Sequence, residues 1–510
     1  MRHTITTTVV NTPTGTPGSS DGVMMLVCYG VAASTGTHAL LTDWAYLGSK
    51  LDDFVTGLGI TKDYDYVNGV SVFQQVNEFY QGGNNDGAYL WLVVTASSNA
   101  YATYVAGNTF KNLIRGTVQS DPAMRVKMVG LCYLPPSAQQ SAADFPSDVT
   151  DTITALQATQ AALFAEGFQF SCILDGKNLS STATSSTLQS MSVKLAPSIS
   201  LCLTGSQPNG VSSVGTALSR FSRITIGHGF GAVEDGASPL QRAFLTNGAY
   251  SPILGTTISQ GTNLTAAHSY MVVAGPVTYN GNVYRIGDVF TVITGTLGFT
   301  GTSTTVVDLT TTGAVTTGHS YYVMAGPVTY NGVSYSVGQT FLAVAASATF
   351  TGGIVYDNFA TDVTKLFGSD INNYGDKQYM FLRPWFGQSG LYWNDGATCD
   401  LSTKPLSTQE FNRVANRLSA DVLSFLALLM GKAIPIDTKT GTAALTFTSA
   451  KQEDFFSQYI NPLIISQDIS GGDLSLTGVR NGVSTINWTY VLTINGNPIT
   501  GSVTGQVKFV

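Results

Sequence analysis

The sequence is poor in charge. Asp, Glu, Lys and Arg make up 11% of its 510 residues, against roughly 25% in an ordinary soluble domain. A monomeric protein relies on surface charge to stay dissolved and unassociated. A chain of this length with 43% hydrophobic residues predicts about two to four domains with real cores. The low charge predicts that much of the surface lies against other subunits.

Several other features are missing, and each absence narrows the function. The chain has no run of Lys or Arg and a net charge of −7, so we expect no nucleic-acid interface. The longest apolar stretches, residues 23–33 and 422–430, are shorter than the roughly 20 residues of a membrane span, so we expect no membrane insertion. Residues 1–20 are polar and Thr-rich and lack the apolar segment of a secretory signal.

Cysteine is scarce, and the count is odd. Four of the five cysteines lie in apolar, strand-like runs. This placement predicts buried, reduced thiols in a protein that is made in a cytosol. The five are Cys28, Cys132, Cys172, Cys202 and Cys399.

The first half of the chain predicts an α/β sheet between layers of helices. Short apolar runs bounded by Gly or Pro alternate with amphipathic stretches, and strands without polar alternation are covered on both faces. Residues 72–80 and 149–165 are the clearest predicted helices. The predicted strands are residues 22–29, 88–95, 125–134, 168–174, 198–203 and 224–226.

An internal repeat interrupts this pattern. Residues 268–281 (HSYMVVAGPVTYNG) recur as residues 319–332 (HSYYVMAGPVTYNG), at an offset of 51. In each copy Tyr-Asn-Gly lies between alternating apolar residues, which predicts a hairpin with a type I′ turn. Residues 256–357 therefore read as two tandem β modules that project from the surface.

Helical periodicity returns after residue 358. Residues 411–430 predict a long helix and residues 451–462 a shorter one, followed by strands at 474–479, 484–494 and 501–510. We divide the chain into an N-terminal arm (1–21), the first part of an α/β domain (22–255), an inserted duplicated β region (256–357), a C-terminal core domain (358–482) and a C-terminal β-hairpin arm (483–510).

Catalysis has one candidate pair. His228 lies in a glycine-rich turn after a predicted strand, and Asp175 ends another strand, which are positions that suit acid–base chemistry. However, no nucleophile elbow accompanies them, and the glycines match neither a dinucleotide fingerprint nor a P-loop. We interpret the turn as structural. The sequence predicts no catalytic residue, no cofactor and no cofactor-binding residue, and we expect that the protein is not an enzyme.

Histidine spacing gives no metal site. Two of the five histidines occupy the same repeat position, and none shows ligand spacing, so no metal is expected. The five are His3, His38, His228, His268 and His319.

Two groups of side chains allow a choice between binding and structural roles. Repeat tyrosines could pack on sugars, although cross-strand pairs inside the modules are preferred. Three arginines could pair with carboxylates of a neighbouring subunit or lie on solvated helix faces. These residues are Tyr279, Tyr284, Tyr330 and Tyr335, and Arg383, Arg413 and Arg417.

The order of several passages resembles the sheath proteins of contractile phage tails and related injection machines. Residues 41–48 (LTDWAYLG), 72–80 and 87–94 (GAYLWLVV) are similar to the opening of the sheath α/β domain. Residues 215–231 resemble the family's small-residue helix, strand and Gly-rich turn. Residues 379–395 (YMFLRPWFGQSGLYWND), followed by a long helix that contains NRVANR, are similar to its C-terminal domain. The resemblance covers residues 22–255 and 358–510, and the repeats lie outside it.

This resemblance implies a structural function. The subunit would polymerise helically around a tail tube and contract, without a nucleotide, to drive the tube through a target envelope. The implied partners are further copies of the chain, the tail tube protein, and the baseplate and tail terminator proteins. The implied location is a virion tail assembled in the host cytoplasm, or else the bacterial cytoplasm or an extracellular injection particle.

The resemblance also implies how subunits connect. Terminal strands of one sheath subunit add to the sheet of another, by β-augmentation. Residues 4–10 are β-prone and have no local partner. Residues 488–494 and 503–510 predict a two-stranded hairpin, which is marginal in isolation, so we expect a neighbouring subunit to stabilise it. The predicted fold is thus an α/β (α+β) sheath-type core from both halves of the chain, with an inserted all-β region and extended terminal arms. The predicted inter-subunit residues are Thr4, Thr6, Thr8, Val10, Trp488, Tyr490, Leu492, Ile494, Val503, Val507 and Phe509.

Two alternatives remain open at this point. The chain could be a glycan- or surface-binding protein that acts through its duplicated modules, or an α/β hydrolase-like enzyme that uses His228. Electron microscopy separates them, because a sheath forms long hollow cylinders. Binding of monomers to a glycan array would favour the first alternative, and turnover lost in His228→Ala the second.

Overall fold

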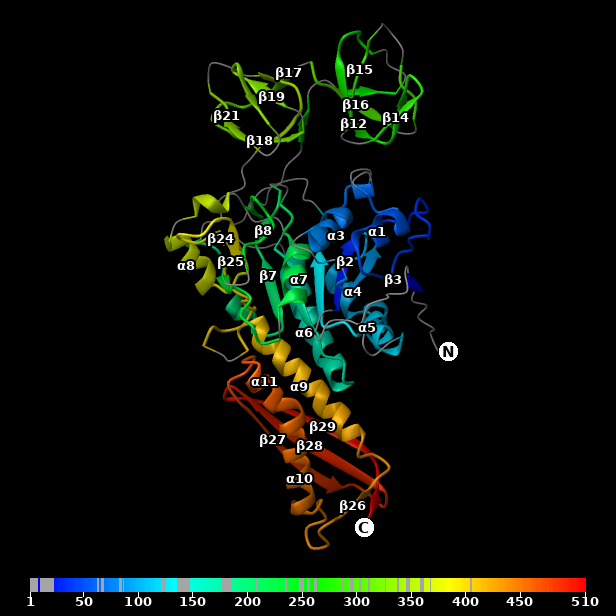
Figure 1. The fold of residues 1–510 in the computed structure, drawn as a ribbon, viewed down its shortest axis with the longest axis vertical. Coiled ribbons are helices and arrows are strands. Elements are labelled where there is room, and N and C mark those ends of the chain that lie inside the picture. Colours follow the sequence, from blue (N-terminus) through cyan, green and yellow to red (C-terminus); the bar gives the residue numbers. More distant parts are fainter. Residues whose placement is uncertain are drawn as a thin grey trace.

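The computed structural model shows an elongated molecule with an α/β body in the middle, two β modules at one end and a smaller C-terminal domain at the other (Figure 1). The mixed α and β architecture agrees with the predicted class. The structure describes residues 8–9 and 23–510, apart from residues 62–63, 66–67, 82–84, 86, 121–123, 135–146, 177–184, 208–209, 225, 234–235, 247–251, 255–256, 261–263, 286–287, 294–297, 302–303, 311, 326, 337–338, 345–348, 358–361, 367 and 404–405.

A seven-stranded sheet forms the centre of the α/β body. Strands β4, β2, β5, β6 and β7 are parallel to one another, whereas β3 and its parallel neighbour β1 run in the opposite direction. Every residue of β2 to β7 is buried, because helices cover both faces of the sheet. In spatial order the strands are β1 (Thr8–Val9), β3 (Ala45–Gly48), β4 (Leu90–Thr95), β2 (Met24–Tyr29), β5 (Met128–Cys132), β6 (Ser171–Asp175) and β7 (Ile199–Cys202).

Helix α7 packs closely on this sheet and on α3. A Cβ atom on Gly130 of β5 would lie 2.5 Å from Val214 Cγ1, and one on Gly215 would collide with the Gln75 carbonyl oxygen. The predicted helices at 72–80 and 149–165 are present as α3 and α6. The body helices are α1 (Leu51–Leu58), α3 (Val72–Gln81), α4 (Tyr101–Ala106), α5 (Asn108–Ser120), α6 (Ser147–Ala165), α7 (Val214–Arg223) and the 3₁₀ turn η2 (Met191–Lys194).

One predicted strand is wrong. Ile224 follows α7 directly, and Ile226 lies in a turn. The reason is tertiary: Gly227 has a positive φ of 82°, and Ile226 packs into the hydrophobic core of the C-terminal domain. A short apolar run therefore connects two domains here and belongs to no sheet.

The duplicated region forms two β modules. Their hairpins turn at Asn280–Gly281 and Asn331–Gly332, all with positive φ, as the Asn-Gly pairs predicted. Module 1 contains β11 (Thr257–Ser259), β12 (Ser269–Ala274), β13 (Val277–Tyr279), β14 (Asn282–Tyr284), β15 (Val289–Thr291) and β16 (Thr305–Asp308). Module 2 contains β10 (Pro252–Leu254), β17 (Thr312–Ala314), β18 (Ser320–Ala325), β19 (Val328–Tyr330), β20 (Val333–Tyr335), β21 (Thr340–Leu342), β22 (Thr349–Thr351) and β23 (Ile354–Asp357).

The two modules are nested in the chain. Strand β10 precedes module 1 but pairs antiparallel with β23, the last strand of module 2. Module 1 is therefore inserted between β10 and the rest of module 2. The two ends of the whole duplicated region, residues 252–357, lie side by side, with Pro252 opposite Tyr356.

The chain after the modules first returns to the α/β body. Residues 363–399 contribute side chains such as Met380, Phe381, Trp393 and Cys399 to the same core as the parallel sheet. The body thus extends well beyond residue 358, where we placed a domain boundary. The elements of the body outside its main sheet are β8 (Thr204–Gly205), β9 (Phe244–Leu245), η4 (Val363–Lys365), α8 (Gly368–Asp376), β24 (Leu382–Pro384) and β25 (Leu391–Trp393).

The C-terminal domain has its own core. A three-stranded antiparallel sheet, in the order β27-β28-β29, packs against α9 and α10 (Figure 1). Its elements are α9 (Gln409–Ala427), β26 (Ala433–Ile434), α10 (Leu445–Phe455), the π-helical turn η5 (Phe456–Ile460), α11 (Asn461–Ile465), β27 (Gly472–Arg480), β28 (Thr485–Ile494), β29 (Asn497–Gln506) and β30 (Lys508–Phe509).

Candidate assembly surface

The predicted arm residues of β28 lie inside their own subunit. Trp488, Tyr490, Leu492 and Ile494 alternate along the strand and are buried. They belong to the core that α9 and α10 cover. Strand β28 pairs with β27 through nine residues and with β29 through ten, so it is the central strand of a three-stranded sheet and not part of a separate two-stranded arm.

The reason for this correction is the third strand. A two-stranded ribbon is marginal by itself, whereas three strands against helices make a stable layer. The buried face of β28 is therefore occupied within the subunit. Its opposite face is open: Thr489 is exposed, and 38% of Val491 is exposed.

The last residues also contact their own domain. Val503 is half-buried against the C-terminal core, and only 5% of Val507 is exposed. Phe509 lies in β30, which pairs in parallel with β26. A Cβ atom on Gly505 would collide with the sulfur of Met430, so glycine allows the strand to approach α9 and the segment after it.

Strand β29 nevertheless presents an open edge. In the part of the chain that the structure describes, it pairs with β28 alone, along ten consecutive residues without a register shift. At the end of this edge, the Gln506 carbonyl oxygen accepts a hydrogen bond from the Gly431 amide at 2.7 Å. Its sequence, NPITGSVTGQ, contains no charged residue. Monomeric proteins protect edge strands with charges, bulges or proline. Here Pro498 is the single device of this kind within the strand.

Outward-facing side chains continue this surface across the sheet, and Asp473 on β27 is a charged residue among them. They alternate with the buried residues and are mostly Ser and Thr, so the surface offers hydroxyl groups but little charge. Thr504 Oγ1 donates a hydrogen bond to Asn487 Oδ1 on β28 at 2.6 Å. The exposed hydroxyl residues are Ser475, Thr477, Thr489, Thr500, Ser502 and Thr504.

At the other end of the chain, Thr8 and Val9 pair in parallel with Tyr46 and Leu47 of β3. This strand, β1, lies at one edge of the body sheet. The structure therefore gives Thr8 a partner in its own chain too. The other predicted residues of this arm, Thr4, Thr6 and Val10, lie outside the described residues.

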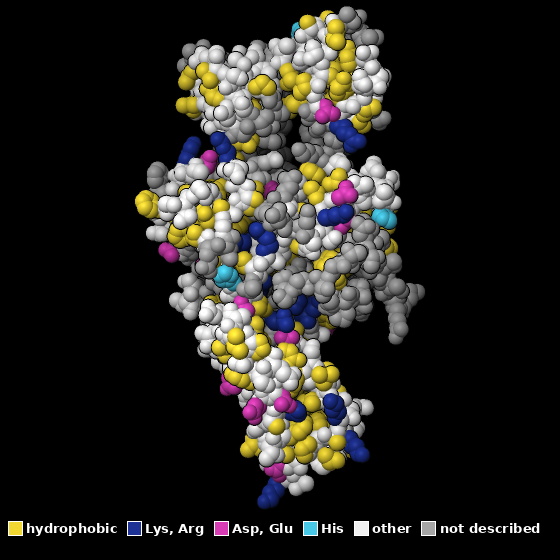
Figure 2. Space-filling view, viewed as in Figure 1, with side chains coloured by type: hydrophobic (Ala, Val, Ile, Leu, Met, Phe, Trp, Pro, Cys, Tyr) yellow, Lys and Arg dark blue, Asp and Glu magenta, His cyan; other side chains and the backbone are white. Residues whose placement is uncertain are grey.

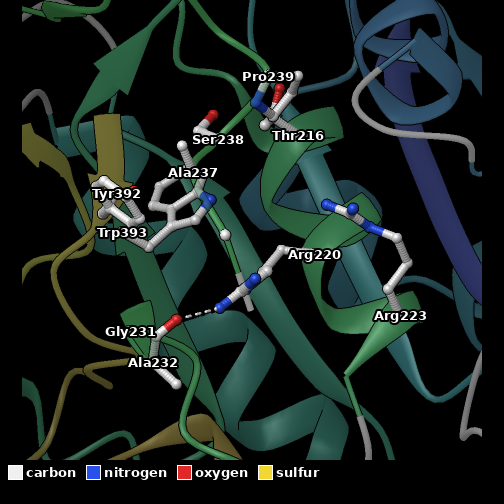
Figure 3. Close-up of a pocket in the computed structure, with 11 residues that line it drawn as sticks. Thr216, Arg220, Arg223, Gly231, Ala232, Ala237, Ser238, Pro239, Tyr392 and Trp393 are labelled. Atoms are coloured by element: carbon white, nitrogen blue, oxygen red, sulfur yellow. Dashed lines mark hydrogen bonds between the residues drawn. The ribbon is translucent and has the colours of Figure 1, made fainter. Parts of the chain in front are cut away.

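The glycine-rich turn around His228 joins parts of the molecule. Arg220 on α7 donates hydrogen bonds to the carbonyl oxygens of Phe230, at 3.3 Å, and Ala232, at 2.8 Å. Figure 3 shows Arg220 directed from α7 toward this turn, with Trp393 beside it. Arg220 thus lines the small pocket beside this turn, and its hydrogen bonds hold the turn in place.

Two glycines show why this turn needs its composition. A Cβ atom on Gly227 would collide with the Asp468 carbonyl oxygen, and one on Gly231 with the Asn394 carbonyl oxygen. Both contacts bring backbone against backbone, which glycine alone permits. This geometry favours the structural interpretation of the turn over a catalytic one.

Asp175 has a structural environment. It is fully buried at the end of β6 and accepts hydrogen bonds from the Tyr133 amide at 3.2 Å and from the Ser212 amide at 3.0 Å. Ser212 Oγ donates to the same carboxylate at 2.7 Å. These bonds tie the segment before α7 to the ends of two strands.

The described histidines, cysteines and carboxylates form no group of three that could hold a metal ion. His268 Nδ1 lies 2.7 Å from Asp308 Oδ2 in module 1. All five cysteines are free and buried, as expected. Burial raises the pKa of Cys202 and Cys399 to about 12, so these thiols stay protonated at neutral pH.

The repeat tyrosines form the module cores. Tyr279 and Tyr330 are buried, and their rings lie 4.9 and 4.6 Å from the rings of Phe290 and Phe341. Tyr284 and Tyr335 are half-buried against the same two phenylalanines. This packing favours the cross-strand interpretation over a sugar-binding one.

The three singled-out arginines lie in different environments. Arg413 is 4% exposed and donates to the Ile224 carbonyl oxygen, so it is not on a solvated helix face. Arg417 Nε lies 2.9 Å from Asp421 Oδ2, one turn along α9. The Arg383 guanidinium stacks 3.7 Å above the Trp385 ring.

None of the helices in the described ranges is long and apolar enough to cross a membrane.

No family model matches the sequence, and no curated protein does. Among solved structures, the chain is similar to a chain of the anti-feeding prophage (AFP) baseplate, determined by cryo-EM and 6-fold symmetrised. The TM-score is 0.40 at 8% identity, over 99% of this chain and 92% of that chain. Similarity at this level leaves the function to be argued from the chain's own surfaces.

Proposed function

We propose that the protein is a structural, non-enzymatic subunit of a contractile tail or injection particle. In this proposal copies of the chain polymerise helically around a tail tube and contract to drive the tube through a target envelope. The tube, baseplate and terminator proteins are its further partners. The particle is a virion tail assembled in the host cytoplasm, or an injection apparatus in the bacterial cytoplasm or outside the cell. The observation that carries the proposal is the uncharged edge of β29, which is open from Asn497 to Gly505.

The open edge supports assembly through strand addition. A strand of another copy that pairs with β29 would satisfy its remaining backbone N–H and C=O groups. Because no charged side chain lies within β29, the approaching strand meets no charge on that strand that would have to be removed from water. We assign the incoming strand to a terminal segment of a neighbouring copy, with Thr4, Thr6 and Val10 as candidates.

A proline substitution tests this edge specifically. Pro498 has no N–H group and still pairs opposite Thr493, so an N–H at this position is not needed by β28. Ser502 is four residues further along, and its amide is therefore directed the same way. Ser502→Pro should leave the subunit folded but prevent strand addition, because the incoming strand loses a donor.

Electron microscopy of the purified protein measures the result. Wild-type protein and the matched control Ser502→Thr should form long hollow cylinders, and Ser502→Pro should remain as folded, unassembled subunits. Cylinders of normal length from the proline variant would contradict assembly through this edge. A wild-type protein that stays monomeric at all concentrations would contradict the proposal as a whole.

Deleting residues 501–510 would be a less specific test of this edge. The deletion would remove Val507, which is 5% exposed, and most of β29, a strand that packs on α9. We expect the truncated domain to lose stability as well as assembly. A point substitution on the edge avoids this ambiguity.

A further inference from the structure

A cationic pocket lies where the α/β body meets α9. Arg125 and Lys127 precede β5, Gln169 precedes β6, and Arg413, Asn416 and Arg417 lie on α9. None of these six lining residues is acidic. Figure 2 shows Lys and Arg side chains gathered at the narrowing between the body and the C-terminal domain.

Gln169 is the residue that gives this pocket a chemical preference. Its side chain is buried, with 3% exposed. Its Oε1 accepts a hydrogen bond from Arg125 Nη2 at 2.6 Å, while its Nε2 is buried with no hydrogen-bond partner. Because a guanidinium group only donates hydrogen bonds, Arg125 fixes the amide with its oxygen toward the arginine and its NH₂ group elsewhere.

A buried donor without an acceptor costs free energy, and so do like charges held close together in a partly buried site. Arg413 is 4% exposed, and Arg125, Lys127 and Arg417 are half-buried. Asp421 partly offsets this charge, through its contact with Arg417. An anion with two or more acceptor oxygens would accept from the amide of Gln169 and from the cationic side chains that line the pocket.

We propose that the cationic pocket binds an oxyanion, a carboxylate or a phosphate group, held by Gln169 and the surrounding Arg and Lys side chains. Such a group has two possible sources. One is a carboxylate side chain of a second copy of this chain, which has 31 acidic against 24 basic residues; this source rests on the proposed function. The other is free inorganic phosphate.

An isosteric substitution of Gln169 places a carboxylate in the pocket as part of the protein itself. Gln169→Glu keeps the acceptor for Arg125 and replaces the unpartnered NH₂ group with a carboxylate oxygen. If the pocket is built for an oxyanion, this variant should be at least as stable as the wild type. In a pocket without that preference, a carboxylate buried to this extent would lower the melting temperature.

Gln160→Glu is the matched control. Gln160 Nε2 donates to the carbonyl oxygens of Phe170, at 3.1 Å, and Ser198, at 3.4 Å. The control carboxylate would therefore face two acceptors and should lower the melting temperature. Opposite responses of these two Gln→Glu variants, both beside β6, are the expected result.

Inorganic phosphate, added to unassembled protein at constant ionic strength against chloride, tests the second source. The expected response is a saturable rise in melting temperature that is absent in Gln169→Glu. Lys127→Gln, which removes one half-buried charge from the wall, should weaken the apparent affinity several-fold. An unchanged affinity in both variants would overturn the assignment of phosphate to this pocket.

The remaining outcomes identify the source or overturn the proposal. If the protein does not respond to phosphate and the Gln169→Glu variant forms no cylinders, the anion is a carboxylate of a second copy. A phosphate response with normal cylinders from the variant would identify the free ion. The proposal is overturned if Gln169→Glu is as destabilised as Gln160→Glu, or if neither phosphate binding nor assembly depends on Gln169. Because phosphate is tested on unassembled protein, its result is independent of whether the wild type polymerises.

Discussion

Trp488 is among the largest side chains that the chain buries completely. It lies on the central strand of the C-terminal sheet, with the Phe447 ring 6.2 Å from its own. Val491, three residues along the same strand, faces outward with 38% of its side chain exposed. These two residues allow the buried and open faces of one strand to be compared directly.

Trp488→Ala should lower the free energy of unfolding by about 3–5 kcal/mol, because it leaves a large cavity in a closed core. Val491→Ala should change it by less than about 1 kcal/mol. Denaturant unfolding followed by circular dichroism measures both. Similar losses in the two variants would mean that the inward face of β28 is not the stabilising one.

Glu78 on α3 is a buried carboxylic acid held by polar neighbours. Ser206 Oγ donates to it at 2.5 Å and Gln74 Nε2 at 3.1 Å, while Thr216 Oγ1 on α7 lies 3.3 Å away. Burial raises the pKa of Glu78 above its ordinary value of 4.5, although these hydrogen bonds oppose the rise. The folded protein therefore holds this proton more tightly than the unfolded chain does.

The sign of the pH dependence follows. Glu78 contributes most stability below its unfolded pKa, and this contribution is lost as pH rises toward the raised folded value. Glu78→Gln should therefore reduce the fall in melting temperature between about pH 5 and about pH 8. Thermal unfolding at several pH values measures this. An identical pH profile in the variant would show that the carboxyl group titrates normally in the folded state.

At the scale of elements, strand β10 links two modules. It pairs with β23 of module 2, yet module 1 separates it from that module in the sequence. Each module has its own core. A smaller cluster joins Met271, Val273 and Val307 of module 1 to Ile354 on β23.

This nesting predicts an asymmetry between two deletions. Removing residues 257–310 keeps β10, so module 2 should retain its outer strand and stay folded. Removing residues 252–310 also removes β10, and β23 then loses the partner of Ile354, Val355 and Tyr356. Hydrogen exchange should show faster exchange of β23 amides in the longer deletion. Equal protection in the two variants would contradict the role of β10.

At the scale of the whole molecule, the modules and the proposed assembly edge lie at opposite ends (Figure 1). The body between them has its own hydrophobic core. The two ends of the duplicated region, residues 252–357, meet where β10 pairs with β23. The region can therefore be deleted without a large gap between the residues before and after it.

A chain that lacks residues 252–357 should accordingly still form cylinders, because β29 and the C-terminal core are untouched. Electron microscopy of this variant beside the wild type measures cylinder formation. A folded variant, as judged by circular dichroism, that forms no cylinders would show that the modules take part in assembly.

Local sequence determined the features that neighbouring residues can specify. Unbroken apolar runs predicted the buried strands β2, β4, β5 and β6, because strands covered on both faces need no polar alternation. The 3.6-residue period predicted α3 and α6. Asn-Gly predicted the turns at 280–281 and 331–332, since both residues accept positive φ.

Tertiary structure alone decided which distant segments meet. Alternation shows that β28 has an apolar face, but α9 and α10 determine that this face is filled within the subunit. The partners of β1, β10 and β30 are separated from them by long stretches of sequence, and a strand's own pattern does not encode which edge it joins. The cationic pocket has the same origin, because its residues converge from the starts of two strands and from a helix more than 240 residues away.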